Sequence, residues 1–171
     1  MIFLLALPAY HGARADDTSE YYIKAAYLYN FAKFMTWPDD TFESEDSPFI
    51  LCILGASPFG DAIKTLEDKM IGKRKYSVQF CEDMGQMKEC HILYISSSEK
   101  ERVQTILGEA AKTPRLTVSD MEDFTQKGGM VRFILKGKKI HFEINIDNVK
   151  RSKLNVSSRL LKIATIVKNT P

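Results

Sequence analysis

The sequence lacks the features that mark several common classes of protein. Its formal net charge is only +2 over 171 residues and no basic stripe stands out, which argues against a nucleic-acid-binding protein. It has no C-x-x-C pair, no G-x-G-x-x-G loop and no G-x-S-x-G elbow, so the usual redox, dinucleotide and hydrolase motifs are missing. What remains is the composition of an ordinary globular domain, with 44% hydrophobic and 27% charged residues.

Residues 1–15 have the pattern of a secretory signal peptide. An apolar run over residues 2–7 is followed by Pro8 and by Ala13-Arg14-Ala15, which has the A-x-A form of a signal-peptidase site. The run has no preceding positive charges, and it is shorter than the roughly 20 residues that span a bilayer. We therefore predict a cleaved signal peptide over residues 1–15 and one mature domain over residues 16–171.

The mature chain alternates between expected strands and expected helices. Short apolar or alternating runs predict strands over residues 49–54, 76–80, 91–95 and 115–118. Helical patterns predict helices over residues 21–37, 61–69, 99–112 and 157–167, and a helical turn over residues 121–126. We expect Ser19 to cap the first of these helices, and Ser97 or Ser98 to cap the helix over residues 99–112.

Residues 130–135 and 139–144 flank the Gly-containing turn at Gly137 and predict a β-hairpin, after which Asp147 caps a short helical stretch. Strands that alternate with helices favour a parallel sheet. The fold class is therefore α/β: a single domain with a mostly parallel central sheet, helices on both faces and a C-terminal antiparallel hairpin.

Three cysteines remain for an oxidising compartment, so one disulfide is possible and one thiol is left over. Cys52 lies in an expected central strand and Cys90 begins another. Adjacent parallel strands would bring these two together, which favours the pair Cys52–Cys90. A Cys81–Cys90 bridge that closes a short loop stays open as the competing pair. Adjacent residues of a strand point to opposite faces, so Cys90 and His91 do not suit a shared metal ion.

Catalytic chemistry finds little support in the residue pattern. Ligands of open α/β sheets bind beyond the carboxyl ends of the strands, where this sequence places Gly55, Ser57 and Ser96. A nucleophilic serine needs a base, and neither His91 nor His141 lies in a recognisable hydrolase context. We expect no catalytic residue, no metal and no cofactor. A small-molecule binding protein that uses this cleft is the alternative function.

Two surfaces are candidates for binding a partner or a ligand. The helix over residues 21–37 is apolar nearly all round, so part of it, with Tyr29 and Phe34, either packs in the core or forms an interface. On the hairpin, one strand face carries Lys139, His141 and Glu143, with Arg132 on the facing strand. This second face is either a solvated sheet surface or a site for an anionic or aromatic group.

The ordered set of motifs resembles the YfiR-like family of periplasmic proteins, over about residues 20–167. The blocks that carry the resemblance are residues 24–34 (KAAYLYNFAKF) with Trp37-Pro38, 51–55 (LCILG), 58–60 (PFG), 90–94 (CHILY), 116–120 (LTVSD), Phe124, 128–131 (GGMV), 142–145 (FEIN) and 157–161 (SSRLL).

The resemblance implies a periplasmic, non-enzymatic regulator of a Gram-negative bacterium that works by binding proteins. In this family, YfiR restrains the inner-membrane diguanylate cyclase YfiN, and the outer-membrane lipoprotein YfiB removes it, which raises cyclic di-GMP. Some members serve other membrane sensors, such as histidine kinases. The resemblance also implies a homodimer and a structural disulfide that matches Cys52 and Cys90. A second cysteine pair is missing here, because Cys81 has no partner.

Overall fold

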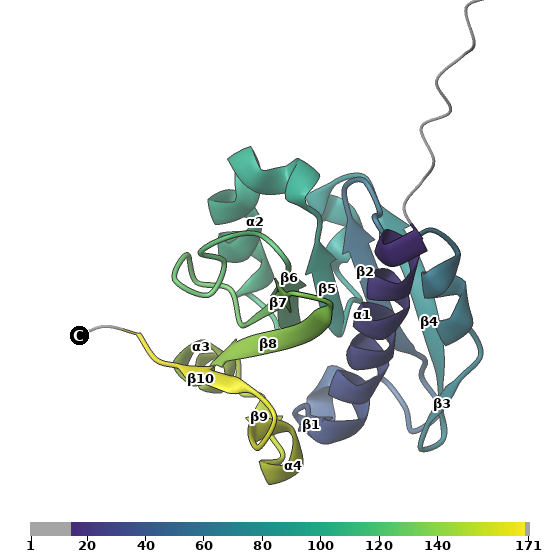
Figure 1. Cartoon of the computed structure of the whole chain (residues 1–171). Coiled ribbons are helices and arrows are strands. Elements are labelled where there is room, and N and C mark those ends of the chain that lie inside the picture. Colours follow the sequence, from purple (N-terminus) through teal and green to yellow (C-terminus); the bar gives the residue numbers. More distant parts are fainter. Residues whose placement is uncertain (1–14, 170–171) are drawn as a thin grey trace, which may run out of the picture.

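The computed structural model describes residues 15–169 of the chain. Its centre is an eight-stranded sheet in the order β10-β8-β7-β6-β5-β2-β4-β3 (Figure 1). The strands are β2 (Phe49–Leu54), β3 (Met70–Ile71), β4 (Arg74–Cys81), β5 (Ile92–Ile95), β6 (Leu116–Ser119), β7 (Val131–Lys136), β8 (Lys139–Asn145) and β10 (Thr165–Val167). Only the β7–β8 and β3–β4 pairs of this sheet are antiparallel, so the predicted mostly parallel α/β sheet and its hairpin are confirmed.

Helical elements cover both faces of the sheet. They are α1 (Ala15–Phe34), α2 (Val103–Ala110), α3 (Ile146–Arg151), α4 (Ser158–Leu161) and the 3-10 helices η1 (Asp39–Thr41), η2 (Gly60–Leu66), η3 (Met84–Met87) and η4 (Ser97–Arg102). Strand β2 is buried along its whole length. Its Leu51 and Ile53 join the core beneath α1 and η2, whereas Cys52 and Leu54 join the core beneath α2.

The first helix is longer at its start and shorter at its end than the sequence predicts. It begins at Ala15 rather than after Ser19, and it ends at Phe34 rather than Trp37. The next two residues form strand β1 (Met35–Thr36), which pairs with β9 (Asn155–Val156). This tertiary pairing ends the helix before Pro38 is reached.

Three further predicted helices are irregular in the structure. The expected helix over 61–69 is the 3-10 helix η2, followed by Asp68 in the left-handed region with φ 64°. The helix over 99–112 is divided into η4 and α2, and its N-terminal side-chain cap is Ser96 rather than Ser97 or Ser98. Residues 121–126 form turns rather than a helical turn.

The C-terminal helix predicted over residues 157–167 is wrong. Ser157 caps a single turn, α4, and the chain then extends into β10, which pairs in parallel with β8. Thr165, Ile166 and Val167 are β-branched, and a free sheet edge suits them better than a helix end. The predicted capping role of Asp147 belongs to Asn145, whose side chain accepts a hydrogen bond from the Asn148 backbone N–H.

The predicted signal peptide lies, apart from Ala15, outside the described residues and stays a prediction. Across residues 15–169, no helix combines the length and the apolar character that crossing a membrane requires.

Candidate functional site

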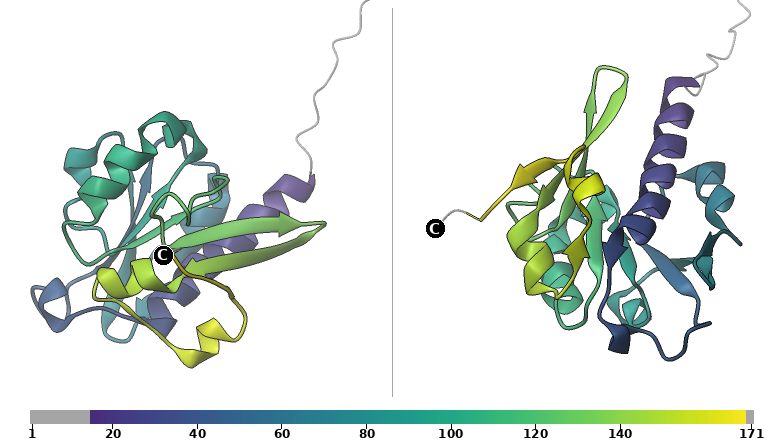
Figure 2. Two further views of the ribbon diagram at one scale, coloured as in Figure 1. Left: turned by 90° about the vertical axis from the view of Figure 1, so that its left-hand side faces the viewer. Right: turned by 90° about the horizontal axis from the view of Figure 1, so that it is seen from below.

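An apolar groove separates the first half of α1 from the β7–β8 hairpin. Figure 2 shows the hairpin projecting beyond the sheet alongside α1. Tyr22 and Ile23 on α1 are 43% and 40% exposed, and Leu135 on β7 is 52% exposed. Ile23 lines two adjoining hollows, one of about 430 Å³ along α1 and one of about 250 Å³ that reaches Leu135 and Ile140. We call these four apolar positions, together with Ala26, the helix–hairpin groove.

The end of the hairpin carries four basic residues, of which one lines the groove. The turn between β7 and β8 carries Lys136, Lys138 and Lys139, and His141 follows on β8 with an exposed side chain. Lys138 itself lines the hollow shared by α1 and the hairpin. Two of the predicted binding residues, Lys139 and His141, lie on the same hairpin but point to its other face, because they alternate with Ile140, which lines the hollow.

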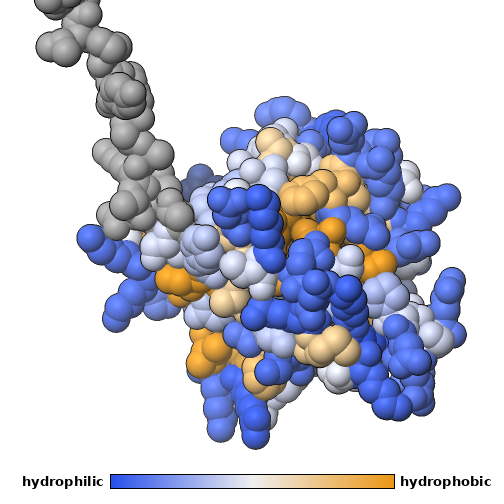
Figure 3. All heavy atoms as spheres, turned by 90° about the vertical axis from the view of Figure 1, so that its right-hand side faces the viewer, coloured by the Kyte–Doolittle hydropathy of each residue, from blue (hydrophilic) through white to orange (hydrophobic). Residues whose placement is uncertain are grey.

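Other exposed apolar residues lie apart from the groove. Phe80 on β4 and Ile163 after α4 are each 61% exposed, and Met70 on β3 is 50% exposed. Figure 3 shows one face of the molecule, on which apolar residues gather in small patches between hydrophilic ones. The groove differs because one of its two hollows is lined both by α1 and by the hairpin, which are more than a hundred residues apart in the chain.

Tyr29 and Phe34 lie on other parts of α1 and do not reach the groove. The Tyr29 hydroxyl donates a hydrogen bond to the Met70 carbonyl oxygen at 2.9 Å, and its ring packs edge-on against Tyr76. Phe34 is half-buried against the core. The structure therefore does not bring these two together with the hairpin residues, and their role in binding stays a prediction.

Arg132 and Glu143 face each other across the β7–β8 pair. Glu143 is buried, and its Oε1 accepts a hydrogen bond from the Thr125 hydroxyl at 2.5 Å and lies 3.7 Å from Arg132 Nη1. Thr125 comes from the turns after β6, which cover this part of the strand. Glu143 is thus separated from the exposed Lys139 and His141, and it supports the base of the hairpin instead of facing solvent.

A buried ion cluster fastens α1 to the carboxyl edge of the sheet. Lys24 is 3% exposed, and its Nζ lies 2.5 Å from Glu20 and 2.9 Å from Asp120, the residue after β6. Burial lowers the pKa of Lys24, but its hydrogen bonds to the two carboxylates and the charge of Asp120 together raise it above 10.5. The residue pattern did not identify this lysine, because an apolar helix with an i, i+4 Glu–Lys pair usually has that pair in solvent.

The cleft expected beyond Gly55, Ser57 and Ser96 is filled by local hydrogen bonds. The Ser96 hydroxyl donates to the Ala56 carbonyl oxygen at 2.6 Å, and the Ala56 N–H donates to the Ser98 hydroxyl at 3.0 Å. A Cβ on Gly55 would meet the Ser98 hydroxyl at 2.5 Å. These contacts attach the loop to the start of η4, and a ligand site at this loop stays a prediction.

A hollow of about 370 Å³ lies instead at the amino edge of the strands, beside His91. The His91 ring stacks on Phe42 and Phe49, with ring centroids at 4.4 and 4.9 Å. Its Nδ1 accepts a hydrogen bond from the Ile50 N–H at 3.0 Å, which leaves Nε2 to carry the proton of the neutral ring. Burial, with the positive charges of Arg74 and Arg115, lowers the pKa of His91 to about 4.

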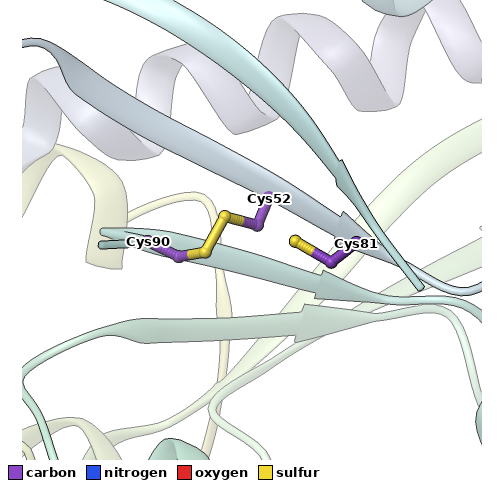
Figure 4. A group of neighbouring side chains, drawn as sticks. All are labelled: Cys52, Cys81 and Cys90. Carbon is purple, nitrogen blue, oxygen red and sulfur yellow. A yellow bond between two sulfur atoms is a disulfide. The ribbon is translucent and has the colours of Figure 1, made fainter. Parts of the chain in front are cut away.

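Cys52 on β2 and Cys90, two residues before β5, form the preferred one of the two predicted disulfides, with their Cα atoms 5.7 Å apart. Cys81, at the end of β4, is a buried free thiol (Figure 4). Burial raises the pKa of this thiol, so it remains protonated at neutral pH.

The described residues do not assemble a nucleophile with a base. Within residues 15–169, no serine, threonine or cysteine side chain is hydrogen-bonded to a histidine, and the Nδ1 of His91 is occupied by a backbone donor. What the surface offers is an apolar groove with Lys138 at its edge, which suits the binding of another protein.

The comparison with known families agrees with this arrangement. A family model described as YfiR/HmsC-like matches residues 21–165, from the first turns of α1 to the start of β10. Members of this family are regulators rather than catalysts, and they are periplasmic. The chain therefore belongs to the YfiR/HmsC-like family, which indicates a periplasmic regulator in cyclic di-GMP signalling.

Proposed function

We propose that the chain binds the periplasmic part of an inner-membrane diguanylate cyclase and holds that enzyme inactive. The observation that carries this proposal is the helix–hairpin groove, in which the exposed Tyr22, Ile23 and Leu135 line two hollows that share Ile23. Membership of the YfiR/HmsC-like family supports a protein partner rather than a substrate.

The chemistry of the groove describes the partner's surface. Apolar and aromatic side chains at the centre of an interface supply most of its affinity, and charges at the rim set the encounter rate and the orientation. Lys138 lines the hollow on its hairpin side, so the matching partner segment presents apolar anchors beside an acidic residue.

Inhibition follows from a difference in affinity between two states of the cyclase. A bound regulator shifts the cyclase toward the inactive conformation only if it binds that conformation more tightly than the active one. A factor of ten between the two affinities shifts the equilibrium by about 1.4 kcal/mol. The family resemblance further supports a homodimer, and an outer-membrane lipoprotein that removes the regulator. A sensor kinase is the other class of membrane partner.

A capture experiment with matched variants tests the proposal. Purified chain is incubated with detergent-solubilised membranes of its host, and bound proteins are identified by mass spectrometry. We expect capture of a diguanylate cyclase with a periplasmic domain, and loss of that capture for Ile23→Asp and Leu135→Asp. Phe80→Asp is the matched control, because Phe80 is also an exposed apolar residue but lies outside the groove. Equal capture by all three variants would contradict the assignment of the groove.

The cavity beside His91 favours a second candidate, a small-molecule binding protein. Its walls combine the Phe42 and His91 rings with Lys88 and Glu89. A ligand present at 100 times its Kd would stabilise the fold by about 2.7 kcal/mol, which a thermal-shift screen of small metabolites detects. A flat response across the panel, with normal capture of the cyclase, would leave the regulator as the only supported function.

A further inference from the structure

Three cysteine sulfur atoms meet in one buried cluster beneath α2. The Sγ atoms of Cys52, Cys81 and Cys90 all lie within 4.8 Å of one another, and all three residues are buried. They come from β2, from the end of β4 and from the residue two before β5. Figure 4 shows the Cys81 sulfur pointing toward the disulfide. The disulfide accounts for the positions of the Cys52 and Cys90 sulfur atoms, but it does not account for the position of the Cys81 sulfur beside them.

We propose that this cluster becomes a three-thiolate site for a thiophilic metal ion, Cu(I), when the Cys52–Cys90 disulfide is reduced. Metal–sulfur bonds of about 2.3 Å in a planar trigonal site place the sulfurs about 4.0 Å apart. All three sulfur atoms lie within 4.8 Å of one another, so Cys81 is within reach of such a site, and Cys52 and Cys90 must move apart after reduction. Their Cα separation of 5.7 Å lets side-chain rotation achieve this without moving the strands.

The surroundings suit a soft ion. The cluster lies in an apolar core that also contains Met87 and, at its edge, Met84, and thiolate and thioether ligands select Cu(I) over hard ions. His91 is not available as a nitrogen ligand here, because it stacks with Phe42 and Phe49 in the core on the other face of the sheet. The site is therefore composed of sulfur alone.

A buried arginine provides the positive charge that three thiolates require. Arg115 is 3% exposed, and its guanidinium donates hydrogen bonds to the Thr113 hydroxyl and the Lys88 carbonyl oxygen. No carboxylate of the described chain lies within 4.0 Å of it, since Glu109 pairs with Lys112 instead. Both the Asp83 carboxylate and the Arg115 guanidinium act electrostatically on Cys81, with opposite signs. A buried cation without a direct counter-ion is costly, and an anionic thiolate cluster would offset its charge.

Formation of the Cu(I) site takes two steps, reduction of the disulfide and binding of the ion. A dithiol reductant gives two electrons and two protons to the Cys52–Cys90 disulfide, and it becomes a disulfide itself. The three thiols then release three protons, and their thiolates bind one Cu(I) ion, which leaves a net charge of −2 beside Arg115. The cavity beside His91 provides an entry path, since Cys90 lines it.

The test uses the purified chain, oxidised or fully reduced under anaerobic conditions, with Cu(I) supplied in competition with a chromophoric chelator. We expect one Cu(I) per reduced chain in native mass spectrometry, three sulfur ligands by X-ray absorption, and no tight binding to the oxidised chain. Cys81→Ser should lower the affinity by more than about 100-fold, because even outer-shell changes at metal sites cost 10–100-fold. Arg115→Met should lower it by about tenfold, with Arg115→Lys close to wild type.

Three results would overturn the proposal. The first is equal Cu(I) affinity for the wild type and Cys81→Ser, and the second is two sulfur ligands rather than three. The third is a reduced chain that binds no Cu(I), whether its circular dichroism shows it to be folded or unfolded. If reduction unfolds the chain, recovery of the folded spectrum with one Cu(I) supports the site.

Discussion

Lys24 and Asp120 are 96 positions apart in the chain, yet the Lys24 ammonium donates a hydrogen bond to the Asp120 carboxylate at 2.9 Å. This contact joins the helix that carries the groove to the end of the central strand β6. Lys24 also lies over the Tyr21 ring, with its Nζ 4.6 Å from the ring centroid. The exposed Tyr22 and Ile23 are therefore presented by a helix whose position is fixed from within the fold.

Replacing this lysine should destabilise the fold. Lys24→Met leaves the carboxylates of Glu20 and Asp120 close together without their cation, and we expect the free energy of unfolding to fall by about 2–3 kcal/mol. This is less than the loss for a completely buried ion pair, because both carboxylates are partly exposed. Chemical denaturation measures the loss. Lys33→Met, at an exposed position of the same helix, is the control and should change stability by less than about 0.5 kcal/mol.

The stability of the fold should fall in mild acid because of His91. Its pKa is about 4 in the folded state and about 6.5 when unfolded, so between these values the unfolded chain binds the extra proton. The contribution of the neutral His91 ring to the free energy of unfolding is complete above pH 6.5. Up to about 3 kcal/mol of this contribution is lost as the pH falls to about 4. His91→Phe keeps the stacked ring without the titration. Denaturation curves at several pH values should show a shallower acid slope for this variant, and parallel slopes would refute the prediction.

Removing the Cys52–Cys90 disulfide should lower the free energy of unfolding more than removing the Cys81 thiol does. The bridge closes a segment with a sequence separation of 38, for which the loop-entropy model gives about 3–4 kcal/mol. We expect the double variant Cys52→Ala with Cys90→Ala to lose about that amount, measured by denaturant titration. Cys81→Ala removes a single buried sulfur from a neighbouring position, and it should lose only about 1 kcal/mol. Similar losses for both variants would contradict this account of the bridge.

The strands were predictable from the sequence because their signal is local. The run Phe49–Leu54 is apolar without interruption, which is typical of a strand buried on both faces of a sheet. Strand β2 has the same bounds. The expectation that these two strands are adjacent and parallel favoured the Cys52–Cys90 pair, although the register places Cys52 opposite Leu93 and Cys90 before β5. The helix ends were less predictable, since β1 and β10 form only by pairing with distant strands.

The groove was harder to predict than the sheet. Periodicity identified α1 as apolar nearly all round, but it could not separate the half-buried Tyr29 from the exposed Tyr22. That difference depends on which strands pack against each side of the helix. For the same reason the sequence pattern could not distinguish the burial of Glu143 from that of His141, which share one face of a strand. Glu143 is buried because the turns after β6 cover it.

The most direct test of the regulator is the activity of its target. Membrane vesicles that contain the captured diguanylate cyclase are sealed with its periplasmic domain facing outward, GTP is enclosed, and cyclic di-GMP production is measured as purified chain is added outside. We predict that the wild type and Phe80→Asp lower production to the same extent, and that Ile23→Asp lowers it only at concentrations at least about tenfold higher, as expected for the loss of a central interface contact. Unchanged production with wild-type chain that demonstrably binds the vesicles would contradict the central claim.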